Sequence, residues 1–195
     1  MTARRSFVAL ELEPQVVAAL LGAGETLRKL APTWRDEKWV AENNLHVTLK
    51  FLGTVKSGVL EALQSDLDGT LSRTQAFTMP LRGLRAIPSH GRRSMVWATL
   101  DDSEGRCARL AEQIDDAAAV HGIERDAKRF TPHVTLVRAR KPRRLDAEAL
   151  SSSNLVVAQR RASMSVLSAT LFASTLTRTG PVYDRVATWR FMPDK

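Results

Sequence analysis

The tetrapeptide His-Val-Thr-Leu occurs twice in this chain of 195 residues, at residues 46–49 and again at residues 133–136. The two copies use two of the four histidines. Random placement of four histidines in such a chain would give this coincidence with a probability on the order of one in a thousand. Inert core strands rarely use histidine twice in the same way. The repeat therefore indicates an internal duplication with a functional residue in each half.

Each copy lies in a segment that alternates as a half-buried strand does. Over residues 45–52 the polar side chains His46, Thr48 and Lys50 fall on one face, and the apolar ones, Phe51 included, fall on the other. Each copy thus presents one imidazole beside one hydroxyl. This pattern is typical of a strand that lines a cleft.

Hydrophobic periodicity predicts the remaining elements. Helices are expected at residues 14–30, 59–71, 107–118 and 145–150, and strands at residues 7–12, 77–84, 95–100, 132–137, 155–157, 165–172 and 182–191. Turns are expected at residues 87–93 and 179–181. No segment is long or polar enough to be a linker between autonomous domains. We expect one domain over residues 1–195, with two lobes of mixed sheet and helix that share a groove.

The charge of the chain favours a polyanionic partner. Its formal net charge is +8 at pH 7, which suits nucleic acid or a phosphorylated small molecule, although such a charge also serves solubility. The single cysteine, Cys107, suits a reducing compartment. The apolar stretch after the basic residues 1–6 is too short for a signal peptide or a membrane span. We therefore expect a cytoplasmic protein without membrane anchoring.

Two imidazoles on opposite sides of a substrate suit in-line displacement at phosphorus. One ring takes a proton from the nucleophile, and the other protonates the departing oxygen. The threonine hydroxyls can hold the non-bridging phosphate oxygens. No carboxylate or cysteine accompanies the histidines at metal-ligand spacing, and the sequence has neither a Gly-x-Ser-x-Gly motif nor a glycine-rich phosphate loop. We expect no metal and no cofactor.

Several segments carry a family resemblance. Residues 44–53 (NLHVTLKFLG), residues 131–138 (TPHVTLVR) and the tail segments 171–174 and 180–183 resemble the 2H phosphoesterase superfamily. They are most similar to its bacterial and archaeal RNA 2′,3′-cyclic phosphodiesterases, historically called 2′-5′ RNA ligases. The resemblance implies a bilobal, pseudo-twofold α+β fold, with two mostly antiparallel sheets flanked by helices around a central groove.

The resemblance also implies an activity. It is hydrolysis of a terminal ribose 2′,3′-cyclic phosphate, on RNA or a nucleotide, to a 2′-phosphomonoester, without metal or cofactor. His46 would be the proton donor to the leaving 3′-oxygen and His133 the proton acceptor from water, while the symmetry of the repeat leaves the two roles interchangeable from the sequence alone. Thr48 and Thr135 would hold the phosphate oxygens. We expect a monomer.

Two basic residues are further candidates for binding substrate. Arg138 follows the second motif as in family members, but strand parity places it on the face opposite His133, so a β-bulge would be needed to turn it. Lys50 has the parity that places it beside His46. The alternative for either residue is a solvated surface charge.

Other interpretations remain open from the sequence. The basic run 138–144 either steers an RNA backbone or forms a solvated loop, and Phe7, Trp34, Trp39 and Trp97 either stack a nucleobase or pack in the core. The same site could run the reverse 2′-5′ ligation. A catalytically idle module that binds RNA or a nucleotide is the alternative of a different class, although phosphate binding alone would be served by lysine or arginine.

Overall fold

The structure, a computed structural model, describes residues 3–88, 90–178 and 180–194. Ser89 and Thr179, in the two predicted turns, lie outside the described residues, as do Met1, Thr2 and Lys195. The helices of the described part are α1 (Pro14–Leu30), α2 (Ser57–Leu71), α3 (Arg106–Val120) and α4 (Ala147–Arg160), with short 3-10 turns at Pro32–Trp34 and Glu42–Asn44. The strands are β1 (Ala3–Glu11), β2 (Lys38–Trp39), β3 (His46–Lys56), β4 (Phe77–Ile87), β5 (Arg93–Leu100), β6 (His133–Arg143), β7 (Ser163–Val166), β8 (Ser168–Thr177) and β9 (Gly180–Arg190).

The strands join in one antiparallel sheet in the order β7-β4-β5-β6-β3-β1-β8-β9, with β2 paired to β6. β3 and β6 pair through one residue pair, Val47 with Val134. The two expected antiparallel sheets are therefore the two halves of one sheet, joined where the two His-Val-Thr-Leu copies meet. The predicted α+β class is confirmed, and the internal duplication stays a prediction.

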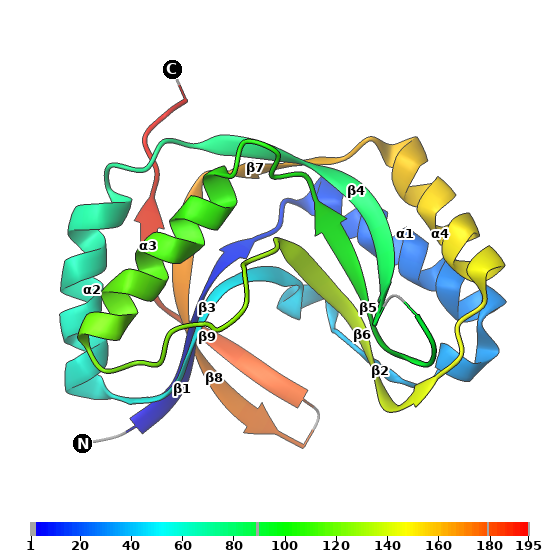
Figure 1. Cartoon of the computed structure of the whole chain (residues 1–195), viewed down its shortest axis with the longest axis horizontal. Coiled ribbons are helices and arrows are strands. Elements are labelled where there is room, and N and C mark those ends of the chain that lie inside the picture. Colours follow the sequence, from blue (N-terminus) through cyan, green and yellow to red (C-terminus); the bar gives the residue numbers. More distant parts are fainter. Residues whose placement is uncertain (1–2, 89, 179, 195) are drawn as a thin grey trace.

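Two helices cover each half of the sheet (Figure 1). α2 and α3 contact the half that contains β3 and β9, while α1 and α4 pack together against the half that contains β4 and β7. Each helix buries an apolar stripe, as in α3, where Cys107, Leu110, Ile114 and Ala118 face the core. Burial also raises the pKa of the Cys107 thiol, so this cysteine acts as a small core residue.

Two predictions for the C-terminal third were wrong. Residues 155–157 are not a strand but lie within the second half of α4, whose buried side chains Ala149, Ser153 and Val157 recur at helical spacing while Leu155 is exposed. The expected strand 165–172 is split at Leu167 into β7 and β8. β7 pairs with β4 and β8 pairs with β1, so the chain passes here from one half of the sheet to the other.

A β-bulge interrupts the alternation after each His-x-Thr. In β3 the register moves from the pair Thr48–Ala9 to the pair Lys50–Val8, which leaves one extra residue on β3. In β6 it moves likewise from Thr135–Trp97 to Val137–Val96. Two consecutive side chains then face the core, and the residues beyond the bulge exchange faces.

The bulge overturns the prediction that Lys50 shares a face with His46. The Lys50 side chain is only 1% exposed, and its Nζ lies 2.5 Å from Asp115 Oδ1, 3.2 Å from Asp126 Oδ1 and 2.7 Å from the Glu124 carbonyl oxygen. Burial raises the pKa of Asp115, but the hydrogen bonds from Lys50 and the Asp126 backbone and the charges of Lys50 and Arg125 together outweigh this effect and hold that pKa below its ordinary value. Lys50 anchors β3 to α3 and to the chain that leads to β6, and it is not available to a substrate.

Lys50→Met is expected to lower the free energy of unfolding by roughly 3 kcal/mol, because removing one partner of a buried ion pair leaves an uncompensated charge. Urea denaturation at pH 7 measures this change. The matched control is Lys56→Met, an exposed lysine at the end of β3, which should change stability by less than about 0.5 kcal/mol. A Lys50→Met protein of full stability would contradict the anchoring role.

Candidate active site

The two His-x-Thr pairs lie on the same face of the sheet, on either side of the junction between β3 and β6. His46, Thr48, His133 and Thr135 are all half-buried, and the residues that alternate with them are fully buried. The Val47–Val134 pair places the two copies side by side. The fold thus brings together four residues that are separated by up to 89 positions in the chain.

Backbone carbonyls orient both imidazoles in the same way. His46 Nδ1 lies 2.7 Å from the Asn44 carbonyl oxygen, and His133 Nδ1 lies 2.9 Å from that of Thr131. A carbonyl only accepts, so the proton of each neutral ring is assigned to Nδ1, which leaves a lone pair on Nε2. In the first copy the Thr48 hydroxyl lies 2.9 Å from His46 Nε2 and donates to it. Each Nε2 is therefore set to accept a proton.

Aromatic rings pack against both imidazoles. His46 stacks on Phe7 with ring centroids 4.9 Å apart, and Tyr183 meets it edge-on at 5.5 Å. His133 stacks on Trp97 at 3.8 Å. Such contacts restrict rotation of the imidazoles and remove water from one ring face.

The surroundings lower the pKa of both histidines below the ordinary value of 6.5. Burial is the largest cause in each case, and the hydrogen bond to the carbonyl of Asn44 or Thr131 opposes it. The positive charge of Arg138 lowers both pKa values further, and His133 adds to the effect at His46. Both imidazoles of the free protein are therefore mostly neutral at pH 7.

The bulge in β6 brings Arg138 to the face that carries the histidines. Strand parity in the sequence makes such a bulge the requirement for Arg138 to reach the site. Arg138 pairs with Met95 on β5, its Nη1 lies 2.8 Å from Met95 Sδ, and its charge acts on both imidazoles. In β3 the corresponding bulge brings round Phe51, which is 55% exposed and lies 6.0 Å from the Phe7 ring. The sequence interpretation placed Phe51 on the apolar face, because strict alternation carries no sign of a bulge.

The other sequence candidates are mostly tied into the fold. In the basic run, Arg140 and Arg143 both pair with Glu37, which fixes this segment to the chain before β2. Trp34 is fully buried, with its Nε1 donating to the Arg144 carbonyl, and so belongs to the core. Trp39 is half-buried, with the Arg28 guanidinium over its ring.

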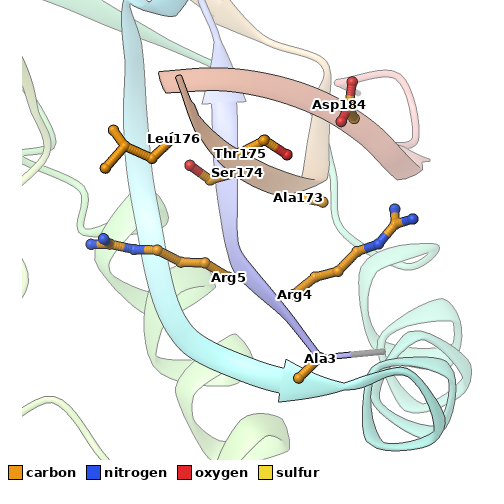
Figure 2. Close-up of a pocket in the computed structure, with 8 residues that line it drawn as sticks. All are labelled: Ala3, Arg4, Arg5, Ala173, Ser174, Thr175, Leu176 and Asp184. Atoms are coloured by element: carbon orange, nitrogen blue, oxygen red, sulfur yellow. The ribbon is translucent and has the colours of Figure 1, made fainter. Parts of the chain in front are cut away.

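Two cavities of the described part have linings that include neither His46 nor His133. One of about 390 Å³ lies between the start of β1 and the β8–β9 hairpin (Figure 2), and one of about 540 Å³ lies between α2 and α3. The central groove stays a prediction. Among the described residues, no three His, Cys, Asp or Glu side chains gather as ligands of a metal would. No helix in the same ranges is long and apolar enough to cross a membrane.

Comparison with known proteins places this chain in a family. The model of the 2′-5′ RNA ligase superfamily matches residues 18–170, which include both histidines. The chain therefore belongs to the 2′-5′ RNA ligase superfamily.

Its relatives include proteins named RNA 2′,3′-cyclic phosphodiesterase. That of Aeropyrum pernix is 32% identical over 79% of this chain and 86% of its own length, and that of Methanothermobacter thermautotrophicus is 29% identical over 95% and 98%. Among solved structures, a protein of Thermus thermophilus matches with a TM-score of 0.76 and 26% identity over 98% of this chain and all of its own. E. coli LigT complexed with 3′-AMP matches with a TM-score of 0.73 and 25% identity over 97% and 98%.

We expect the imidazole signals of His46 and His133 to titrate below pH 6.5 in NMR spectra, and both pKa values to rise in Arg138→Ala, because a nearby positive charge is removed. Arg140→Ala is the matched control: it removes the same charge from the same strand, at a guanidinium that bonds to the Asp36 carbonyl and pairs with Glu37. Equal effects of the two variants would contradict the placement of Arg138 at the site.

Proposed function

We propose that this protein hydrolyses terminal 2′,3′-cyclic phosphates of RNA or nucleotides to 2′-phosphomonoesters by metal-free acid-base catalysis. The observation that carries the proposal is the pair of imidazoles on one face of the sheet, each with its Nδ1 held by a backbone carbonyl and its Nε2 left to exchange a proton, and each two residues before a threonine of the same face. The names of the relatives from Aeropyrum pernix and Methanothermobacter thermautotrophicus support the substrate class.

In this mechanism His133 is the proton acceptor. Its Nε2 takes a proton from a water molecule, whose oxygen attacks the phosphorus of the cyclic phosphate. His46, in its protonated form, donates a proton from Nε2 to the ribose 3′-oxygen. The bond between phosphorus and the 3′-oxygen breaks, and the products are a 3′-hydroxyl and a 2′-phosphate. A proton returned from solvent to His46 and one lost by His133 restore the starting state.

Protonation of His46 also changes what Thr48 can do. In the neutral state the Thr48 hydroxyl donates to His46 Nε2. When Nε2 carries the proton that it gives to the ribose 3′-oxygen, it can no longer accept from Thr48, and the hydroxyl proton is free to point toward a non-bridging phosphate oxygen. The Thr135 hydroxyl donates to the phosphate from the side of the second motif.

Arg138 supplies the positive charge of the proposed site. It faces the same side as the histidines and already interacts electrostatically with both. A guanidinium binds phosphate oxygens in a planar, two-point manner. The negative phosphate in turn raises the pKa of His46, so substrate binding itself favours the protonated donor. In this proposal Arg138 binds the substrate phosphate, a role that the buried Lys50 cannot fill.

Replacing either histidine tests the acid-base assignment. His46→Ala and His133→Ala are each expected to lower kcat at least ~100-fold, since a positioned acid or base contributes at least that much. The assay follows opening of a 2′,3′-cyclic nucleotide in the presence of a chelator, with identification of the 2′- or 3′-phosphate product. His90→Ala, an exposed loop histidine, is the control and should stay within about twofold of the parent.

Three outcomes of that assay would count against the proposal. Full activity in either variant would remove the two-histidine mechanism, and loss of activity on chelation would remove the metal-free one. RNA binding without turnover by the parent would leave a binding module in place of an enzyme.

The rate should also depend on pH with a definite sign. kcat/KM reports the free enzyme, in which both histidine pKa values are lowered. The protonated fraction of His46 declines as pH rises through its lowered pKa, so kcat/KM should reach its maximum below pH 6.5 and decrease by up to tenfold per pH unit above it. Arg138→Ala should move the maximum to higher pH. A maximum above pH 7.5 in the parent protein would be inconsistent with these pKa shifts.

A further inference from the structure

The histidine face of the sheet continues past His46 as two rows of side chains that run across β3, β1, β8 and β9. Residues directly opposite one another in antiparallel strands have side chains on the same face. The row nearer His46 is largely aromatic and consists of Phe51, Phe7, Phe172 and Arg185. The next row is polar and consists of Thr54, Arg5, Ser174 and Tyr183.

Arg5 points to the side of the sheet that carries the histidines. The register of β1 with β8 is unbroken from Arg5 to Ala9, so Arg5 shares the face of Phe7, which stacks on His46. Burial raises the pKa of Tyr183, and the charge of Arg5 opposes this effect, so the two side chains are close. In Figure 2 the side chains of Arg5 and Arg4 point in opposite directions.

The Arg5 guanidinium is available to a ligand. It is exposed, and no hydrogen bond or ion pair recorded for the described residues involves it, whereas Arg185 in the neighbouring row is paired with Glu11. Its cross-strand neighbours Thr54 and Ser174 each bring a hydroxyl to the same face. A guanidinium between two hydroxyls is a set of donors suited to a phosphate.

The polar row lies within side-chain reach of the first histidine, because Tyr183 belongs to this row and its ring meets His46 edge-on at 5.5 Å. Arg5 lies two residues along β1 from Phe7, about 7 Å at the usual rise of a strand, and Phe7 contacts His46. The aromatic row lies between Arg5 and the histidines. A ribonucleotide likewise has its nucleoside between its own 3′-phosphate and the phosphate that precedes it.

We propose that Arg5, with Thr54 and Ser174, binds the phosphodiester group immediately upstream of the nucleotide that carries the cyclic phosphate. This subsite rests on the proposed function and makes an RNA end a better substrate than a cyclic mononucleotide. The ligand is the 5′-phosphate side of the terminal nucleotide, and the reaction at the cyclic phosphate is unchanged.

The test compares two minimal substrates, a 2′,3′-cyclic mononucleotide and the dinucleotide that ends in the same cyclic phosphate. The parent protein should have a higher kcat/KM for the dinucleotide. Arg5→Ala should reduce that preference by roughly 10- to 100-fold, the range of a charge-assisted hydrogen bond. Arg4→Ala is the matched control, because it removes an equal charge one residue away on the opposite face, and it should leave the preference between the substrates in place.

A third substrate isolates the phosphate contact. A dinucleotide with an uncharged methylphosphonate linkage should lose the same preference in the parent protein, and Arg5→Ala should then have little further effect, because the interaction is already absent. Equal loss of preference in Arg5→Ala and Arg4→Ala would overturn the subsite, since general charge would then be the cause. So would a parent protein that treats the two charged substrates alike while opening both, although the proposed function would stand. Opening of neither substrate would overturn the proposed function and the subsite together.

Discussion

The pairing of β3 with β6 through Val47 and Val134 is the contact on which the rest of the arrangement depends. It joins two half-sheets, each backed by its own pair of helices, into one surface. Because the paired valines face the core, the residues on either side of each valine face outward together. The contact is small, yet it decides that His46 and His133 share one site and do not lie on separate surfaces.

The two bulges then decide what surrounds the histidines. Strict alternation would have turned Lys50 outward and Arg138 inward. One extra residue in each strand reverses this orientation. Lys50 turns into the core and pairs with Asp115, and Arg138 and Phe51 turn to the face that carries the histidines. The two halves are thereby made different in chemistry, with a guanidinium beside one motif and an exposed aromatic ring beside the other. Such an asymmetry suits a substrate that has a phosphate at one end and a base and ribose at the other.

The electrostatics of the site follow from this placement. Burial and the nearby charge of Arg138 hold both imidazoles largely neutral in the free protein, so in the proposed mechanism it is the bound anion that stabilises the protonated donor. The carbonyls of Asn44 and Thr131 fix the ring orientation and direct both reactive nitrogens outward. Among the described residues no carboxylate pairs with Arg138, which is available to an anion. Arg140 and Arg143, by contrast, are paired with Glu37 and stabilise the fold.

The sequence by itself determined the α+β class, the four outward-facing residues of the two motifs and the helices, because these depend on local periodicity and on an improbable repeat. It also indicated that Arg138 needed a bulge. Only the tertiary structure decided the faces of Lys50 and Phe51, the continuation of α4 through residues 155–157 and the break at Leu167. A bulge, and the change of partner strand at Leu167, arise from register with strands distant in the chain, and Asp115 is the partner of Lys50 only once α3 packs on β3. The rows beyond His46 likewise exist only through pairing of β1, β3, β8 and β9, which no local pattern of the chain encodes.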